Sequence, residues 1–523
     1  MKYYPFLILI FILLLPLQKG DTAEISSIEI DRMDVFDSEL QKDNWFVYRW
    51  GNTLHILTKE WVIRDELLYD VGEELDTLKI LETERNLRAL EFIGDADTEL
   101  NYNDDSSKVD VELTTSDQWT TIIGPTSEGS GGEYTFGFAL SEKNLFGWGK
   151  DIMGEYYTGN DLKGHYFDYI DYNFFRTRLR AALSWENDGY VRKTEFSIRR
   201  PLYSLTDKYA VSIYGFDSNG NIRYFNSGYE LFRYQSQSQN YLATLTRSYG
   251  VIFKKNLSIK LQWSDKEYFY ASQFSTFRSL VPPDETETRA DLELYLGKSG
   301  YKTVRYLDNF GNVEDLTLGW GLIMSIGRAF EILGGNITRN YGKIKLSTAF
   351  NPARDIYIAA SSSASARFNG DWSNAFYANK LYLYWKNSQR TVSALRLLAG
   401  FYDRPDSYIV NYIGGKFGLR GYDNYALAGQ NYLVANFEQR YYSPIKILTV
   451  ALGFAGFVDV GKSWYENAGY DSEDWKADVG IGLRFGLTKS SGNKVVRIDI
   501  ARSLSEDKYN LSFGTLMFFS FGR

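Results

Sequence analysis

Residues 257–264 read Leu-Ser-Ile-Lys-Leu-Gln-Trp-Ser, so that each apolar side chain is followed by a polar one. The same alternation recurs at residues 178–186 and 495–501. Successive side chains of a strand point to opposite faces, so each segment predicts a strand with one apolar and one polar face. From about residue 130 such segments, each about ten residues long, follow one another between Asn, Gly, Asp and Ser turns. This is typical of a transmembrane β-barrel, although a soluble sandwich would alternate in the same way.

The composition favours the barrel. Aromatic residues make up 17% of the 523 residues, and 45 glycines stand beside only 9 prolines. Aromatic residues are enriched in strands and glycines in tight turns. The mean hydropathy of −0.33 does not fit a helical membrane protein, whereas a barrel with a polar interior averages to such a value. Tyr and Trp near strand ends are expected to form girdles at the two membrane surfaces.

The residue counts exclude several kinds of chemistry. The chain has no cysteine and two histidines, His55 and His165. This excludes disulfides, zinc ribbons, thiol nucleophiles and iron–sulfur clusters. No two acidic residues stand out as a catalytic pair, so we expect no enzyme activity, no metal site and no cofactor. The net charge of −8 gives the chain no general basic character for binding nucleic acid.

The N-terminus predicts export. Lys2 precedes ten consecutive apolar residues, 6–15, and Pro16 then breaks the run. The run is shorter than a spanning helix and fits the apolar region of a signal peptide over residues 1–20. Gly20 and Ala23 are both candidates for the cleavage position.

Residues 25–118 carry the clearest helix signals. Thr58 and Asp76 are candidate caps for two helices, and Gly72 suits the end of the first. Strand-like segments lie on both sides, the last two being residues 91–100 and 109–113. The order β-α-α-β-β predicts a small α+β domain.

A glycine-rich loop near the C-terminus carries the strongest functional signal. It includes Gly418-Leu419-Arg420-Gly421-Tyr422. Alternation in the next two strands assigns Glu438, Arg440, Phe457, Asp459 and Gly461 to the barrel interior. A carboxylate at membrane depth needs a partner, and an arginine offers two parallel hydrogen bonds. We therefore expect this loop to enter the barrel, with Arg420 paired to Asp459 and with Glu438 as a further partner.

These motifs resemble the outer-membrane protein assembly factor family, the BamA/TamA-like bacterial surface antigen barrels. Leu419-Arg420-Gly421-Tyr422 is similar to the motif of their sixth extracellular loop, and Phe457-Val-Asp459-Val-Gly461 to the strand motif that receives the arginine. Glu438 and Arg440 match a Glu-x-Arg pair on the intervening strand. Asn144-Leu-Phe-Gly147-x-Gly149 resembles the turn after the first barrel strand.

Two further segments extend the resemblance. Residues 25–118 resemble a POTRA domain, the periplasmic module of this family, through Ile63-Arg64-x-Glu66-Leu67-Leu68, Gly72 and residues 82–88. Ser512-x-Gly514-x-x-Met517-x-Phe519 fits the last-strand signal of outer-membrane barrels. The sequence departs from that signal because Phe521, Gly522 and Arg523 follow the final aromatic residue.

The resemblance implies a signal peptide, a periplasmic POTRA-like domain and an outer-membrane barrel of sixteen antiparallel strands over residues 126–523 in a Gram-negative bacterium. The segments that can be counted directly number in the high teens, and an even number is expected. The implied function is insertion or translocation of other polypeptides. The implied partners are unfolded outer-membrane or secreted proteins, membrane lipid and accessory lipoproteins.

Two other functions remain open. Only one POTRA-like domain precedes the barrel, whereas the main assembly factors carry several, so a dedicated exporter of one secreted protein is the first alternative. A passive porin is the second, and it would lack both the POTRA domain and the pairing of Arg420 with Asp459.

Overall fold

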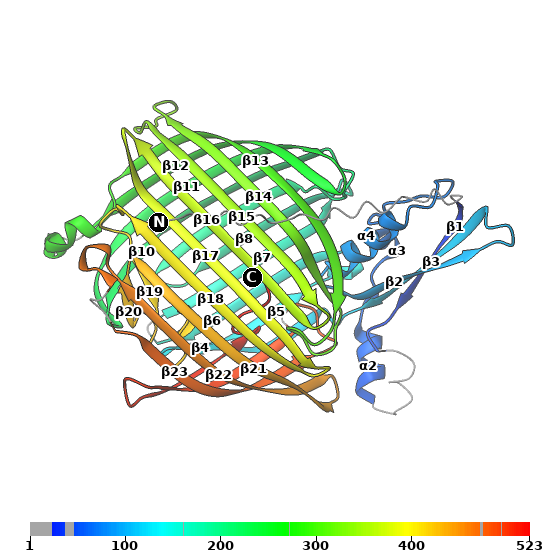
Figure 1. Ribbon diagram of the computed structural model, residues 1–523. Coiled ribbons are helices and arrows are strands. Elements are labelled where there is room, and N and C mark those ends of the chain that lie inside the picture. Colours follow the sequence, from blue (N-terminus) through cyan, green and yellow to red (C-terminus); the bar gives the residue numbers. More distant parts are fainter. Residues whose placement is uncertain are drawn as a thin grey trace, which may run out of the picture.

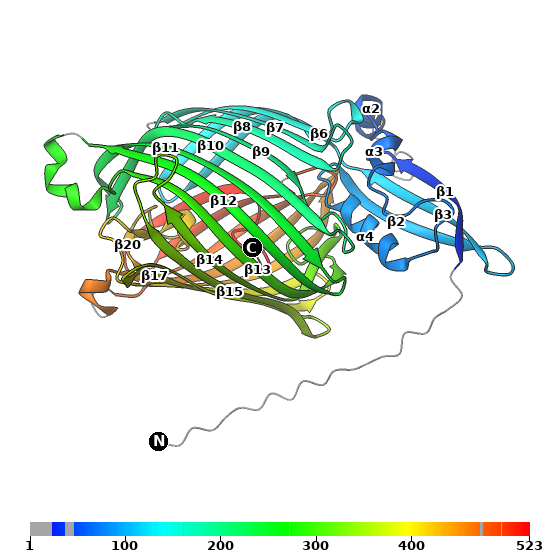
Figure 2. The ribbon, with the colours of Figure 1, turned by 90° about the horizontal axis from the view of Figure 1, so that it is seen from above.

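The computed structural model describes residues 23–36, 46–160, 162–270, 272–470, 474–492 and 494–522. A small mixed domain packs at one end of a large β-barrel (Figures 1 and 2). The signal peptide predicted for residues 1–20 lies outside the described residues. Within those described ranges, no helix is both long enough and apolar enough to cross a membrane.

The described part of the N-terminal domain, residues 23–36 and 46–117, contains three strands and three helices. The strands are β1 Glu24–Met33, β2 Ile93–Tyr102 and β3 Lys108–Asp117. The helices are α2 Phe46–Leu54, α3 Glu60–Arg64 and α4 Thr77–Arg88. Strand β3 is central, parallel to β1 and antiparallel to β2. The side chain of Asp76 accepts a hydrogen bond from the backbone N–H of Leu78 (2.9 Å), which confirms the predicted cap of α4.

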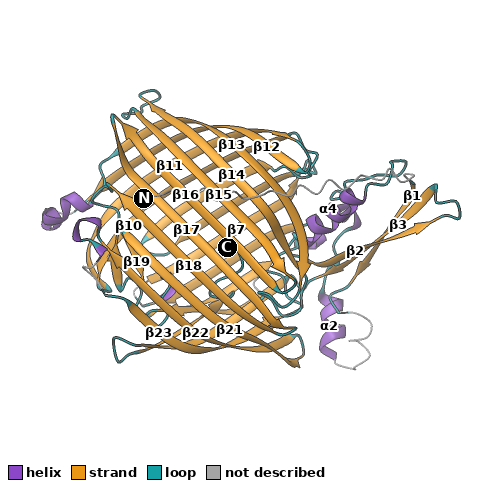
Figure 3. Ribbon diagram, viewed as in Figure 1, coloured by secondary structure: helices purple, strands orange, loops and turns teal. Residues whose placement is uncertain are grey.

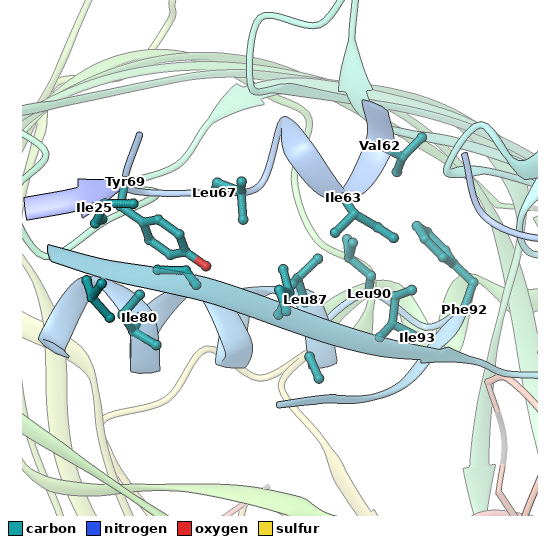
Figure 4. Packing of buried hydrophobic residues seen from close by; sticks show 14 of the residues in the cluster. Ile25, Val62, Ile63, Leu67, Tyr69, Ile80, Leu87, Leu90, Phe92 and Ile93 are labelled. Atoms are coloured by element: carbon teal, nitrogen blue, oxygen red, sulfur yellow. The ribbon is translucent and has the colours of Figure 1, made fainter. Parts of the chain in front are cut away.

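One apolar core holds this domain together (Figure 4). It joins Ile63 of α3 and Leu87 of α4 to Ile25 and Val109 of the sheet, all fully buried. Full burial of such a side chain contributes about 1.5–3 kcal/mol relative to exposure. The domain therefore has a core of its own, and Tyr172 of the barrel packs against the edge of that core.

The prediction of a POTRA-like domain is not supported by this part of the structure. A sheet of three strands with neighbouring helices is found there, and this arrangement does not identify a POTRA domain. Any pair of amphipathic helices can cover so small a sheet, so the order of elements in the sequence is not specific to one family.

The rest of the chain forms a closed antiparallel barrel of twenty strands (Figure 3). Neighbours along the chain are neighbours in the sheet, and β25 closes on β4. The strands are β4 Thr121–Ser130, β5 Glu133–Glu142, β6 Lys150–Gly159, β7 Leu162–Phe174, β8 Leu179–Asn187, β9 Val191–Arg200, β10 Tyr209–Asn226, β11 Tyr229–Tyr249, β12 Phe253–Phe269, β13 Glu285–Val304, β14 Glu314–Phe330, β15 Arg339–Ala353, β16 Ile356–Asn369, β17 Asp371–Ser388, β18 Thr391–Asp403, β21 Asn431–Ile447, β22 Val450–Trp464, β23 Lys476–Leu487, β24 Val495–Ser503 and β25 Tyr509–Thr515.

Smaller elements lie in the connections. Strands β19 Asn411–Ile413 and β20 Leu427–Gly429 pair with each other in the loop between β18 and β21. The short 3₁₀ helices are η1 Leu145–Gly147, η2 Ser272–Leu280, η3 Gly415–Phe417 and η4 Glu466–Ala468.

The predicted sixteen strands were wrong, because the barrel has twenty. Sixteen came from the family resemblance. Alternation reports which face a residue occupies, and another hairpin can be added to a closed sheet without changing that pattern in any strand. Six short strands, β4 to β9, already lie between residues 121 and 200.

The outer face of the barrel is apolar. In β12 the exposed side chains include Leu257, Ile259 and Leu261, while Lys260 lies on the opposite, inner face and pairs with Glu293 (2.7 Å). On β23, Ile481 is 72% exposed. A surface of this kind and size is unfavourable in water and favourable in lipid, where a closed barrel also satisfies its backbone hydrogen bonds.

Candidate functional site

The loop between β18 and β21, residues 404–430, folds back into the barrel lumen. Leu419 is fully buried and packs with Ile413, Tyr422 and Val434. Gly418 has a φ of +126°, in the region that favours glycine, and a Cβ there would lie 2.9 Å from a Val434 methyl carbon. The loop is thereby anchored beside the side chain of Arg420.

Arg420 is the centre of the site. Its guanidinium donates to both carboxylate oxygens of Asp459, from Nε (2.8 Å) and Nη2 (2.9 Å). Its Nη1 donates to Glu438 at 2.5 Å. All three side chains are fully buried. The structure thus brings together Arg420 of the loop, Glu438 of β21 and Asp459 of β22, so that charge adds to the apolar packing that anchors the loop on these two paired strands.

These residues belong to a larger ion-pair network in the lumen, which we call the Arg420 network. Glu438 also pairs with Arg440 (2.7 Å) and Arg484 (3.4 Å). Among the residues that the structure describes, these ion pairs join four arginines and four carboxylates, Arg420, Arg440, Arg484, Arg497, Asp308, Glu438, Asp459 and Asp499. Its formal charges cancel, which is what a buried network requires.

Aromatic rings cover the guanidinium of Arg420. The ring of Phe457 lies 3.5 Å from its Cζ and that of Phe518 lies 4.1 Å from it. Cation–π contacts of this kind gain strength where water is excluded. Arg420 is therefore held by charge in the plane of the guanidinium and by rings over its faces.

The glycines of the motifs allow close approach of the loop. A Cβ on Gly421 would lie 2.5 Å from the Cβ of Asp478, and one on Gly461 would lie 3.3 Å from a methyl carbon of Leu419. The Tyr422 hydroxyl donates to the Ala477 carbonyl (3.1 Å). Each of these contacts ties the loop to the wall formed by β22 and β23.

The predicted first-hairpin turn was wrong. Asn144, Gly147 and Gly149 follow β5, the second barrel strand, because β4 begins at Thr121. The turn instead docks the N-terminal domain. The Asn144 amide donates to the Thr58 hydroxyl (2.8 Å), and a Cβ on Gly147 would lie 2.6 Å from the Leu57 carbonyl oxygen.

Further contacts fix the N-terminal domain on this end of the barrel, which we call the domain end. Arg88 of α4 donates to both carboxylate oxygens of Asp315 on β14, each at 2.9 Å. Asn86 donates to the Tyr203 carbonyl (3.2 Å). Helix α4 therefore lies across the mouth of the lumen at the domain end (Figure 1).

Glu66 predicts a pH dependence of this docking. Burial raises the pKa of its carboxyl to about 8, partly offset by Arg178, and the Tyr203 hydroxyl donates to it. Since the folded pKa lies above the ordinary value of 4.5, its contribution to stability is complete below that value and is lost as pH rises through about 8. Thermal stability is expected to fall between about pH 4.5 and about pH 8 and to level off above that range. Glu66→Gln should remove that component, and an unchanged pH profile in this variant would contradict the assignment.

Only the first half of the predicted last-strand signal lies on the last strand. Ser512 and Gly514 lie on β25 and face the lumen, where Arg497 donates to the Ser512 hydroxyl (3.3 Å). Met517 and Phe519 are not on that strand, because β25 ends at Thr515 and Leu516 has a φ of +70°. The chain turns inward there, and both side chains are buried inside the barrel. The spacing in the sequence carried no sign of this turn.

Sequence reasoning missed half of the Arg420 network. Arg497 and Asp499 alternate with Val496, Ile498 and Ile500, so their inward position was readable, and Arg484 follows the same rule on β23. Asp308 had no such signal. It lies in the connection between β13 and β14, which enters the lumen and places Asp308 beside Arg440 (2.7 Å).

A cavity of about 2230 Å³ runs between the domain end and the Arg420 network. Its lining is mixed, with Glu155 and Glu186 on one side and Lys343, Lys345 and Lys380 among the others. Among the described residues, no group of three His, Cys, Asp or Glu side chains is placed to hold a metal ion.

No known protein family and no curated protein matches the chain in sequence. Several solved structures resemble it. BamA from Haemophilus ducreyi lacking POTRA domains 1–3 is 12% identical over 94% of this chain and 84% of that chain, with a TM-score of 0.40. CdiB from Escherichia coli is 12% identical over 95% and 76%, with a TM-score of 0.48. The FrpB iron transporter from Neisseria meningitidis is 7% identical over 82% and 87%, with a TM-score of 0.43. These likenesses concern the fold, a large closed β-barrel.

Proposed function

We propose that this chain is an outer-membrane insertase or translocase that passes other polypeptides along the junction of β4 and β25. We call that junction the seam. The proposal combines the family-like motifs of the Arg420 loop with the construction of the seam. It assigns the chain no enzymatic step.

The seam is the observation that carries the proposal. Across its described residues β25 and β4 register through one residue pair, Phe513 with Gly129. By contrast, β24 and β25 register through seven pairs and β4 and β5 through ten. Most of β4 therefore presents an edge that faces no registered partner. Such an edge accepts an added strand through its backbone groups.

Aromatic contacts of Phe513 close the seam on the outside. Its ring stacks on Tyr134 of β5 with centroids 5.8 Å apart, and it meets Phe136 of the same strand with centroids 6.1 Å apart. It reaches Tyr134 across Gly129, where a Cβ would lie 2.8 Å from the ring. Pro125 of β4 lacks an N–H, which is typical of an edge strand. The seam is thus closed by small contacts that can be broken without unfolding the barrel wall.

The N-terminal sheet supplies a second edge. Its order β1-β3-β2 leaves β1 and β2 as outer strands. In the proposed function an extended client pairs with one of these edges before it reaches the seam. The domain end, where α4 covers the lumen, then faces the periplasm.

A disulfide across the seam tests the proposal in cells. Glu128 precedes Gly129 and Gly514 follows Phe513, so the two residues lie next to the Phe513–Gly129 pair on antiparallel strands. A Cβ on Gly514 would lie 3.7 Å from Glu128 Cγ. Because the chain has no cysteine, E128C/G514C can form only this intramolecular bond. The oxidised variant is expected to deplete many outer-membrane barrels, and reductant should restore them. An unchanged outer-membrane proteome would contradict the proposal.

A dedicated exporter is the second candidate, because the lumen cavity of about 2230 Å³ offers a route through the barrel itself. The same experiment separates the two functions. Loss of one secreted protein, with other outer-membrane proteins at normal levels, would assign dedicated export. S363C/A378C is the matched control, since these residues face each other on β16 and β17, away from the seam.

A further inference from the structure

The C-terminal residues 516–522, which we call the tail, cross the barrel lumen. Strand β25 ends at Thr515, and the Leu516 N–H donates to the Val495 carbonyl (2.7 Å) as the chain turns inward. Met517 and Phe519 are buried, and a Cβ on Gly522 would lie 3.9 Å from the Cβ of Ala359 on β16. The tail therefore runs from the seam into the barrel.

The backbone of the tail is bound by side chains of β17, β21 and the connection between β13 and β14. The Phe519 carbonyl accepts from Arg440 Nη2 (2.7 Å) and from the Tyr384 hydroxyl (3.3 Å). The Phe521 N–H donates to Asp308 Oδ2 (2.8 Å). Both hydrogen-bonding groups are main-chain atoms, so any extended polypeptide could supply them.

Aromatic side chains provide the rest of the binding. Phe518 lies over Arg420, and Phe519 lies 4.9 Å from Arg440 Cζ. Tyr384 meets Phe519 and Phe521 edge to face, with centroids 6.2 and 5.4 Å apart. Rings packed against arginines and a tyrosine in this way add more to the free energy of binding than their buried area alone would give.

The bound tail also borders open space. Met517, Ser520, Phe521 and Gly522 line the lumen cavity of about 2230 Å³. Of the groups that bind the tail, Asp308 also lines this cavity, whereas Arg440 and Tyr384 are buried against Phe519. Displacement of the tail would open Arg440, Tyr384 and Asp308 to the cavity, and these three residues form what we call the tail groove.

We propose that the tail groove is a binding site for extended, aromatic-containing polypeptide segments, which the chain's own tail occupies until another segment displaces it. Because the tail continues from β25, its displacement also frees β25 on the inner side of the seam. The proposal rests on the proposed function only for the identity of the displacing chain, a client in transit. Binding at the groove is a separate property.

A tethered tail tests this proposal in the full chain. A Cβ on Gly522 would lie 3.9 Å from the Cβ of Ala359 on β16, which is within the range of a disulfide. In A359C/G522C, oxidation links the tail covalently to β16, and reduction removes this link so that another segment can displace the tail. The probe is a fluorescein-labelled peptide with the sequence of residues 516–523, Leu-Met-Phe-Phe-Ser-Phe-Gly-Arg.

The reduced variant is expected to bind this peptide at least about tenfold more tightly than the oxidised variant. A peptide with serine in place of its three phenylalanines should bind neither form. S363C/A378C is the control, because its disulfide joins two wall strands and leaves the tail free. Its oxidation should not change peptide binding.

Three results would overturn the proposal. These are equal binding by the oxidised and reduced forms, no binding by the reduced form, and failure of the 359–522 disulfide to form. The experiment does not depend on client insertion. If the peptide binds as expected but the protein inserts no client, only the proposed function is rejected. If the protein inserts clients but the peptide does not bind, only the tail groove is rejected.

Discussion

Replacing Arg420 with alanine is expected to release the loop of residues 404–430 from the lumen and to abolish function. The substitution leaves Asp459 and Glu438 fully buried without the cation that joins them. Removing one partner of a buried ion pair typically costs about 3–5 kcal/mol. The expected results are a loss of that size in the free energy of unfolding in urea and rapid proteolysis within the loop.

Arg420→Lys is the matched control. Lysine keeps the positive charge but cannot make the two parallel hydrogen bonds to Asp459. We expect an intermediate loss of stability and partial protection of the loop. If the alanine variant resisted protease as well as the parent chain does, the Arg420 network would not be what holds the loop in the barrel.

Replacing Glu438 with glutamine is expected to have an effect of similar size. This carboxylate pairs with three arginines, Arg420, Arg440 and Arg484. Without it the buried network carries one excess positive charge, and neighbouring guanidinium groups repel one another at low effective dielectric. The free energy of unfolding in urea is expected to fall by about 3–5 kcal/mol, although the side chain keeps its shape.

Two comparisons make the Glu438 prediction specific. Glu293→Gln changes a lumen carboxylate that forms an ion pair with Lys260, and both side chains are partly exposed. Its cost should be about 1 kcal/mol or less. The double variant R420A/E438Q should lose less than the sum of its single variants, by about 0.5–3 kcal/mol. Strict additivity would show that the two residues do not act as one network.

Alternation located most of what matters for this site. It placed Glu438 and Asp459 inside the barrel. Phe437 on β21 and Val458 on β22 face lipid, so the next residue of each strand must point to the interior. Together with the requirement that a buried carboxylate be paired, this was enough to select Arg420. The inference needed no knowledge of how many strands the barrel has.

Other features could not be read from the sequence. The inward turn at Leu516 depends on a left-handed backbone conformation at a residue that rarely adopts it. Asp308 is held in the lumen by Arg440 and by the Phe521 N–H of the tail, and both lie far away in sequence. Asn144, Gly147 and Gly149 form a turn in either position, so their motif could not show which hairpin they close.

The central claim is that polypeptides pass along the seam between β4 and β25. Its most direct test is the rate at which purified E128C/G514C in lipid vesicles inserts an unfolded outer-membrane barrel. The oxidised protein should insert the client at least about tenfold more slowly than the reduced protein, while oxidation of S363C/A378C should change nothing. Equal insertion rates with the seam closed and open would contradict the claim.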